Sequence, residues 1–166
     1  MKKSIVILAS ILSIFNFCTA QKQAASPAET ATGKINGATI TIKYGSPSVK
    51  GREIWGQLVP FDKVWRAGAN DATTFETDKD VIVEGATLPA GTYSFFVIPN
   101  QKECVIIFSK QTNQWGAYSY KEKEDQLRVK VAPVAKTDST EKLLYTISDN
   151  KVKLSWANWD IVFKVK

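Results

Sequence analysis

Apolar and polar residues alternate one by one along much of the chain after residue 37. In the segment 38–44, Ile40, Ile42 and Tyr44 fall on one side, and threonine and lysine residues fall on the other. Because successive side chains of a strand point to opposite faces, this alternation predicts β-strands with one buried face. Later segments repeat the pattern, and each predicts a strand of the same kind: residues 127–131, 143–147, 152–156 and 161–165.

Two further segments, residues 92–98 and 104–108, carry apolar side chains on both faces. Strands of this kind are covered on both sides in folded proteins. Short strands are also expected at 73–77 and 80–83, and turn-forming residues separate the segments. About nine short strands with little helix predict an all-β fold, an antiparallel β-sandwich of jelly-roll-like form.

The stretch from Gly51 to Thr74, GREIWGQLVPFDKVWRAGANDATT, follows neither strand nor helix rules throughout. Apolar residues ahead of Pro60 recur at helical spacing, which predicts one short helix near residues 52–59. The residues concerned are Ile54, Trp55, Leu58 and Val59. We expect the apolar part of the stretch, up to Trp65, to cover one face of the two-sided strands. Small residues at 67–70 allow the backbone to approach a neighbouring element closely.

Residues 1–20 have the composition of a secretory signal peptide. Lys2 and Lys3 precede an apolar core, and small residues ahead of Gln21 provide a cleavage site. The apolar run is shorter than the roughly 20 residues of a membrane-spanning helix, so we expect no stable membrane insertion after cleavage. We therefore predict a periplasmic or extracellular protein. Lipoprotein anchoring at Cys18 is the less favoured alternative, because large residues precede that cysteine.

Residues 21–33 are small, polar and aperiodic, which is typical of a flexible linker. The remaining residues, 34–166, are enough for a single β-sandwich domain with a sizeable core. The formal net charge is +6, and the lysines alternate with apolar residues along the predicted strands instead of gathering on one element. This arrangement is typical of a solvated sheet face, so we expect no nucleic-acid partner.

The chain contains no histidine and, beyond the signal segment, one cysteine, Cys104. These absences exclude histidine-dependent nucleophilic catalysis, histidine-ligated metals, cysteine zinc sites and iron–sulfur clusters. Cys104 stands in an apolar run, which predicts a buried and unreactive thiol. The sequence contains no glycine-rich phosphate loop and no calcium-loop spacing, so we expect no cofactor and no metal site.

One irregular segment holds four side chains suited to ligand binding: Trp65, Arg66, Asn70 and Asp71. Arginine presents a rigid fork that matches carboxylates. Arg66 therefore either contacts a ligand or, as we favour, pairs with an internal carboxylate and locks the loop against the sheet. Asp71 and Asp125 are the expected partners, with Asn70 bracing the same loop.

A second irregular segment, residues 113–120, is rich in aromatic residues. Trp115, Tyr118 and Tyr120 can form a stacking platform for sugar rings, or they can cap the open end of the sandwich. The pattern favours neither role over the other.

Three separated motifs resemble a known family: VKGREIWGQLVPFDKVWRAGANDATTF, LPAGTYSFFVIP and NQWGAYSYKEKEDQLRVKV. The chain is similar there to domain of unknown function 2911, a group of small exported bacterial proteins, and the resemblance covers residues 38–166. It implies a β-sandwich in the cell envelope or outside the cell, and no established activity. It emphasises the positions Gly51, Trp65, Arg66, Gly68, Asn70, Trp115, Gly116, Tyr118, Asp125 and Arg128.

The chain departs from the common family forms at two places in the first motif. Phe61-Asp62 stands where tyrosine and glycine are common, and Ala67 stands where threonine follows the arginine. Any contact that this threonine hydroxyl makes in other members cannot form here.

These observations favour a non-enzymatic binding module for a small polar or glycan ligand in the cell envelope. A hydrolase acting on envelope polysaccharide is one alternative, because two carboxylates across a cleft suffice for that reaction. Its candidate carboxylates are Asp62, Asp71 and Glu76. A purely structural interaction domain is the other alternative. The candidate ligand-binding residues are Trp65, Arg66, Asn70, Asp71, Trp115, Tyr118, Tyr120, Asp125 and Arg128.

Overall fold

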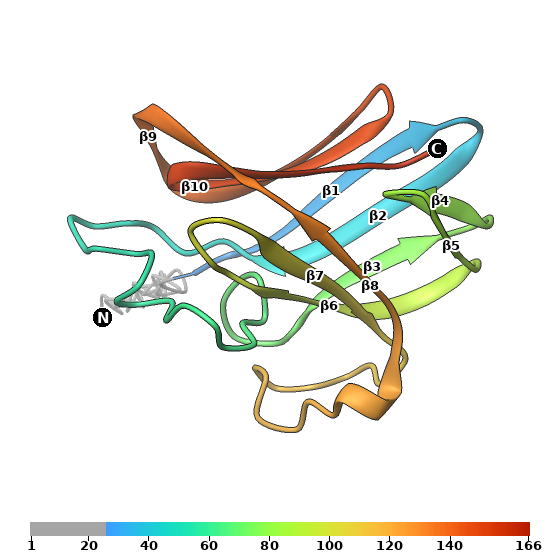
Figure 1. Ribbon diagram of the computed structural model, residues 1–166, viewed down its shortest axis with the longest axis horizontal. Helices are drawn as coiled ribbons and strands as arrows, with labels where there is room; N and C mark the ends of the chain where they lie inside the picture. The colour runs from blue at the N-terminus through green and yellow to red at the C-terminus, as the bar shows by residue number, and fades with distance from the viewer. Residues whose placement is uncertain (1–25) are drawn as a thin grey trace, which may run out of the picture.

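The computed structural model describes residues 26–166 and arranges them in two stacked layers of antiparallel strands (Figure 1). The larger layer is a six-stranded sheet with the order β1-β2-β3-β6-β7-β8. Its strands are β1 (Ala28–Ile35), β2 (Ala38–Gly45), β3 (Thr73–Thr77), β6 (Gly91–Ile98), β7 (Cys104–Ser109) and β8 (Asp125–Val131). The predicted all-β, antiparallel fold is confirmed. The predicted signal peptide, residues 1–20, lies outside the described residues.

The smaller layer is a pair of long antiparallel strands that crosses over one face of the six-stranded sheet (Figure 1). These strands are β9 (Pro133–Ser148) and β10 (Lys151–Lys164). Register shifts on either side of Ala157 interrupt their pairing, and such bulges bend a strand. A short hairpin of β4 (Val81–Val83) and β5 (Ala86–Leu88) adjoins the end of β10 through a bridge between Val83 and Val165.

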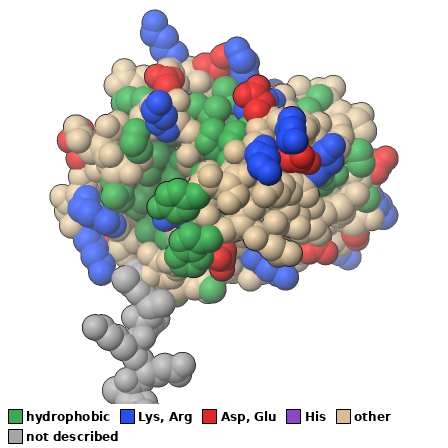
Figure 2. All heavy atoms as spheres, turned by 90° about the horizontal axis from the view of Figure 1, so that it is seen from below, with side chains coloured by type: hydrophobic (Ala, Val, Ile, Leu, Met, Phe, Trp, Pro, Cys, Tyr) green, Lys and Arg blue, Asp and Glu red, His purple; other side chains and the backbone are tan. Residues whose placement is uncertain are grey.

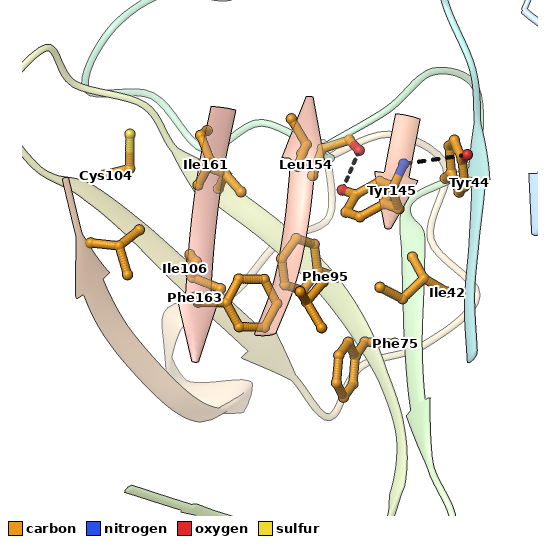
Figure 3. Close-up of a cluster of buried hydrophobic side chains, with 14 of the residues drawn as sticks. Ile42, Tyr44, Phe75, Phe95, Cys104, Ile106, Tyr145, Leu154, Ile161 and Phe163 are labelled. Atoms are coloured by element: carbon orange, nitrogen blue, oxygen red, sulfur yellow. Dashed lines mark hydrogen bonds between the residues drawn. The ribbon is translucent and has the colours of Figure 1, made fainter. Parts of the chain in front are cut away.

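The core lies between the two layers and contains the apolar side of each alternating strand (Figure 3). Phe95 of β6 stacks on Phe163 of β10 with ring centroids 5.8 Å apart. Phe75 of β3 meets Phe108 of β7 edge to face at 5.0 Å. Cys104 is fully buried in this core, as predicted, and burial raises the pKa of its thiol.

The predicted helix near residues 52–59 is wrong. This segment forms turns and isolated bridges, and the only helical segment among residues 26–166 is one 3-10 turn, η1 (Glu122–Glu124). Gly56 has a φ of 89°, outside the helical region, and its N–H donates forward to the carbonyl of Val59 at 2.9 Å. In a helix each N–H donates backward along the chain. No helix in the described part of the chain is long and apolar enough to cross a membrane.

The predicted linker, residues 21–33, is wrong for its last residues, because β1 begins at Ala28 and pairs with β2 along its whole length. Backbone hydrogen bonds can hold such an edge strand without an apolar stripe, so no clear alternation marks it. Gly33 lets β1 lie against β9, since a Cβ on this residue would stand only 2.7 Å from Cγ2 of Ile147.

The outer face of β6 and β7 is covered, as predicted, but of the stretch that was expected to cover it only Val64 packs there. Trp55 and Trp65 instead pack against Trp156 in the core between the layers. The outward-facing Phe96 and Ile107 form a separate small cluster. The side chains packed against this cluster include Val64, Ala117 and Tyr120. The loop between β7 and β8 therefore lies over this face.

Candidate functional site

The loop of residues 66–72 is joined to the loop between β7 and β8 by backbone pairing. Asp71 and Trp115 form an isolated antiparallel bridge. The N–H of Ala72 donates to the carbonyl of Gln114 at 2.9 Å. On the other side of the bridge, the N–H of Gly116 donates to the carbonyl of Asn70 at 3.1 Å. Asp71 and Trp115 are thus a non-hydrogen-bonded pair, whose side chains are close neighbours on one side of the ribbon.

Two glycines allow the first of these loops to approach β2. A Cβ on Gly45 would collide with the carbonyl oxygen of Ala69, and a Cβ on Gly68 would stand 3.0 Å from the carbonyl oxygen of Gly45. The N–H of Ala69 donates to the carbonyl of Gly45 at 3.2 Å. The close backbone approach predicted for residues 67–70 is therefore confirmed, and β2 is the neighbouring element.

The carbonyl of Ala67 fixes the same loop to the second layer. It accepts hydrogen bonds from Oγ1 of Thr73 at 3.0 Å and from the hydroxyl of Tyr145 at 2.7 Å. Tyr145 is buried, and its burial raises the pKa of the hydroxyl well above its ordinary value. The hydroxyl is therefore a neutral donor, and it holds the loop at Ala67.

An open cleft of about 500 Å³ lies between these loops and the outer face of β1, β2 and β3. We call it the polar cleft, because charged and amide side chains line it: Glu29, Lys43, Asn70, Asp71, Asn113 and Gln114. Thr30, Lys43 and Thr74 stand opposite one another across the three strands and line the same cleft. Two of the predicted residues, Asn70 and Asp71, thus share one concave surface.

Two buried polar groups next to this cleft have atoms without a partner among residues 26–166. Ser94 pairs with Thr74 in the sheet register and is fully buried, and its Oγ makes no hydrogen bond. Gln114 is 5% exposed, and its Nε2 donates to the carbonyl of Gln111 at 2.6 Å, whereas its Oε1 accepts no bond. A buried polar atom without a partner is costly, so Gln114, which lines the cleft, is suited to accept a hydrogen bond from a hydroxyl or amide group of a bound molecule.

Trp115 and Tyr118 are the most exposed large hydrophobic side chains of the described residues, at 63% and 86%. Figure 2 shows hydrophobic side chains gathered in the middle of one face of the molecule, with charged side chains around them. Gly116 turns the chain between the two residues with a φ of 64°, and a Cβ there would stand 3.0 Å from the Tyr118 ring. Exposed rings beside a polar cleft are suited to stacking on the apolar face of a sugar.

Arg66 forms no ion pair with any residue of 26–166, so its predicted pairing with Asp71 or Asp125 is wrong. Its Nε is buried without a partner. A Cβ placed on Gly116 would lie 3.8 Å from Nη1 of Arg66 and 3.0 Å from the Tyr118 ring. Arg66 and Tyr118 thus both lie next to Gly116. The guanidinium therefore lies near the exposed aromatic residues instead of near a carboxylate.

Two other candidates of the first segment make structural contacts. The Nδ2 of Asn70 donates to the carbonyl of Ser26 at 3.2 Å, which ties the loop to the beginning of the described chain. Trp65 is 9% exposed, stacks on Trp156 at 5.8 Å and exchanges backbone hydrogen bonds with Val97. Trp65 therefore belongs to the core and offers little surface to a ligand.

Tyr120, Asp125 and Arg128 form one hydrogen-bonded network at the end of the second loop. The Tyr120 hydroxyl donates to Oδ2 of Asp125 at 2.6 Å. Arg128 donates from Nε to the same carboxylate oxygen and from Nη2 to the Tyr120 hydroxyl, each at 2.6 Å. Burial and the bond to Asp125 raise the pKa of Tyr120 to about 12. The Tyr120 ring packs on Phe96 at 5.2 Å, so this tyrosine caps the outer face of the sheet and fastens the loop.

The three carboxylates considered for hydrolysis lie in different surroundings. Asp71 lines the polar cleft, whereas Asp62 accepts a hydrogen bond from Nδ2 of Asn100 at 2.8 Å. Glu76 is exposed on β3 and does not line the cleft. The second carboxylate in the polar cleft is Glu29.

Among the charged and amide residues that line the cleft, sequence reasoning named Asn70 and Asp71 and missed four: Glu29, Lys43, Asn113 and Gln114. Glu29 fell in the predicted linker. The alternation of residues 38–44 correctly put Lys43 on the outward face, but outward lysines are common and this position carried no further signal.

The described chain is thus a two-layer antiparallel β-sandwich protein with an open polar cleft, and the loop between β7 and β8, which borders this cleft, carries two exposed aromatic side chains. It belongs to the family described as protein of unknown function (DUF2911), whose model matches residues 26–165. This match confirms the family resemblance of the three sequence motifs. No curated protein and no solved structure matches the chain.

Proposed function

We propose that this protein is a non-enzymatic binding module for a small polar or glycan ligand, with the polar cleft, Trp115 and Tyr118 as its binding site. One observation carries the proposal: Trp115 is 63% exposed and is the direct bridge partner of Asp71, which lines the cleft. Sugars have an apolar ring face and a rim of hydroxyl groups, so an aromatic ring beside a carboxylate suits both surfaces.

The hydrogen-bonding groups of the cleft support a ligand rich in hydroxyl groups. Asp71 and Glu29 provide acceptors, Lys43 provides donors, and the amide of Gln114 can do both. The unpaired Oε1 of Gln114 gains most from a ligand donor, because it is buried and bonds to nothing among the described residues.

The loops that form the site are fastened before any ligand arrives. The Ala67 carbonyl accepts two hydroxyl bonds, and Tyr120 is bonded to Asp125 and Arg128. A site that is already ordered loses less conformational entropy when a ligand binds, and this smaller loss increases the affinity. We place this site in the cell envelope or outside the cell, because residues 1–20 have the composition of a secretory signal.

A thermal-shift screen of the purified protein against neutral oligosaccharides, with an assay for released reducing ends in parallel, tests the proposal. We expect at least one oligosaccharide to raise the melting temperature without being cleaved. Release of reducing ends would instead support the hydrolase alternative, with Asp71 and Glu29 as the carboxylates of the cleft.

The variant Trp115→Ala should abolish the ligand-induced shift, whereas Leu144→Ala should retain it. Leu144 is a matched control because it is also an exposed apolar residue, at 45%, but lies on β9 in the other layer. An equal shift in Trp115→Ala and in the unaltered protein would contradict the proposed site.

A further inference from the structure

A second cleft, of about 390 Å³, shares no lining residue with the polar cleft. It lies between residues 49–61 and the bulged part of β10, and we call it the aromatic cleft. The lining side chains that matter most are Arg52, Glu53, Trp55, Phe61, Ser139 and Trp159. The volume falls in the range of small-molecule clefts, about 300–1,000 Å³. Nothing in the proposed function uses this cleft.

Stacked aromatic rings form one wall of the aromatic cleft. Trp159 stacks on Trp55 with centroids 4.9 Å apart and an interplanar angle of 13°. It also stacks on Phe61 at 5.7 Å and 22°. Stacking occupies ring faces and leaves ring edges for a ligand. The edges of aromatic rings carry partial positive charge, so they favour electron-rich atoms such as oxygen.

Trp55 adds an unsatisfied donor to this wall. The residue is 7% exposed, and its Nε1 is buried without a hydrogen-bond partner among residues 26–166. An indole N–H can only donate, so the group that satisfies it must be an acceptor. A buried donor without an acceptor is costly, so a ligand that brings one gains affinity.

Arg52 adds a fixed positive charge. Its Nε donates to the carbonyl of Val49 at 3.0 Å and its Nη2 to the carbonyl of Ser48 at 2.5 Å. The described residues contain no ion pair of Arg52, so its charge is not neutralised by a bonded carboxylate. Glu53 is exposed in the same cleft and opposes an anion, but water and salt screen an exposed charge.

We propose that the aromatic cleft is a second binding site, for a ligand whose carboxylate or phosphoryl group is carried on a ring-sized body. The anionic oxygens accept from Nε1 of Trp55 and lie within the field of the Arg52 guanidinium, and Ser139 offers a further hydroxyl donor. Arginine suits both kinds of oxyanion, because its planar fork matches carboxylate and phosphate geometry.

Calorimetric titration with three compounds of the same pyranose body tests the preference for an anion: glucuronate, glucose 6-phosphate and glucose. We expect one of the two anions to bind at least about tenfold more tightly than glucose at low salt, because one charge-assisted hydrogen bond is enough to account for a tenfold difference in affinity. Tighter binding of glucuronate identifies a carboxylate ligand, and tighter binding of glucose 6-phosphate identifies a phosphoryl ligand. Equal affinity for all three, or no binding of either anion, would overturn the proposal.

Variants then locate the site. Arg52→Gln removes the charge, and Trp55→Phe removes the N–H while keeping an aromatic ring, so each should weaken anion binding about tenfold or more. Lys151→Gln, which removes an exposed lysine at the start of β10, should leave the affinity within about twofold.

Trp55→Phe keeps the test decisive if Arg52→Gln loosens the loop that Arg52 ties to Val49. An anion affinity that is unchanged in Trp55→Phe would place the binding site elsewhere and refute the assignment to this cleft.

Discussion

The hydroxyl of Tyr120 should contribute measurably to the stability of the fold. Tyr120→Phe removes this hydroxyl and no ring atom, so the packing on Phe96 is retained. The hydroxyl lies 2.6 Å from Oδ2 of Asp125 and 2.6 Å from Nη2 of Arg128, and each bond involves a charged group. Hydrogen bonds to charged groups contribute about 1.5–3 kcal/mol each.

The lower end of this range applies, because Asp125 and Arg128 remain bonded to each other at 2.6 Å after the substitution. Arg128 also keeps its contact with Glu122 at 3.2 Å. We therefore expect Tyr120→Phe to lower the free energy of unfolding by about 1.5 kcal/mol at neutral pH.

The same substitution should change how stability depends on pH. The pKa of Tyr120 is raised from its ordinary value of 10.0 to about 12 in the folded protein. The folded state therefore favours the protonated hydroxyl, and this contribution is complete below pH 10.0 and is lost as the pH rises through about 12. The difference in stability between the two proteins should shrink over that interval.

Urea unfolding followed by circular dichroism, at neutral pH and across the alkaline interval, measures both effects. Tyr118→Phe is the matched control, because it is the same chemical change at a residue that is 86% exposed. It should alter stability by less than about 0.5 kcal/mol. A change that small for Tyr120→Phe, or a difference that stays constant at high pH, would refute the reasoning.

Three further predictions concern the loops and the chain start. Gly45→Ala should lower the free energy of unfolding by about 1–3 kcal/mol, because the new methyl group collides with the backbone of Ala69. An unchanged midpoint of urea unfolding would contradict the close approach. Arg66→Ala should cost far less than the roughly 3–5 kcal/mol of a broken buried ion pair, because Arg66 has no ion pair among the described residues; a loss of that size would reveal a buried pair. N-terminal mass spectrometry should find mature protein that begins at Gln21, and a lipid-modified peptide that begins at Cys18 would show a lipoprotein.

The alternation of apolar and polar residues was sufficient to predict most strands and the fold class, because one buried face imposes a period of two on the sequence. The predicted helix near residues 52–59 failed because apolar residues at helical spacing are equally compatible with a loop that buries most of them, here all but Leu58, and Gly56 favours the loop. Strand β1 was missed over residues 28–33 because backbone pairing, which leaves little mark on side-chain composition, holds it at the sheet edge.

The candidate site could be predicted only in part. The small residues at 67–70 predicted that the backbone approaches a neighbouring element closely. The exposed aromatic residues of the second loop were identified because they stand in a segment without regular alternation. The partner of Arg66 could not be predicted, because nothing in the sequence says which carboxylate the fold brings near it. Asp125 is instead hydrogen-bonded to Tyr120 and Arg128, which are close to it in the sequence.

The most direct test of the central claim is a titration followed by nuclear magnetic resonance. The chain has five tryptophans, so the ¹⁵N-labelled protein should show one indole signal for each. On addition of the neutral oligosaccharide that stabilises the protein most, we predict that the indole signal of Trp115 shifts together with the backbone amides of Asp71 and Gln114. If these signals stay in place while the ligand binds, the ligand occupies another surface and the proposed site is wrong.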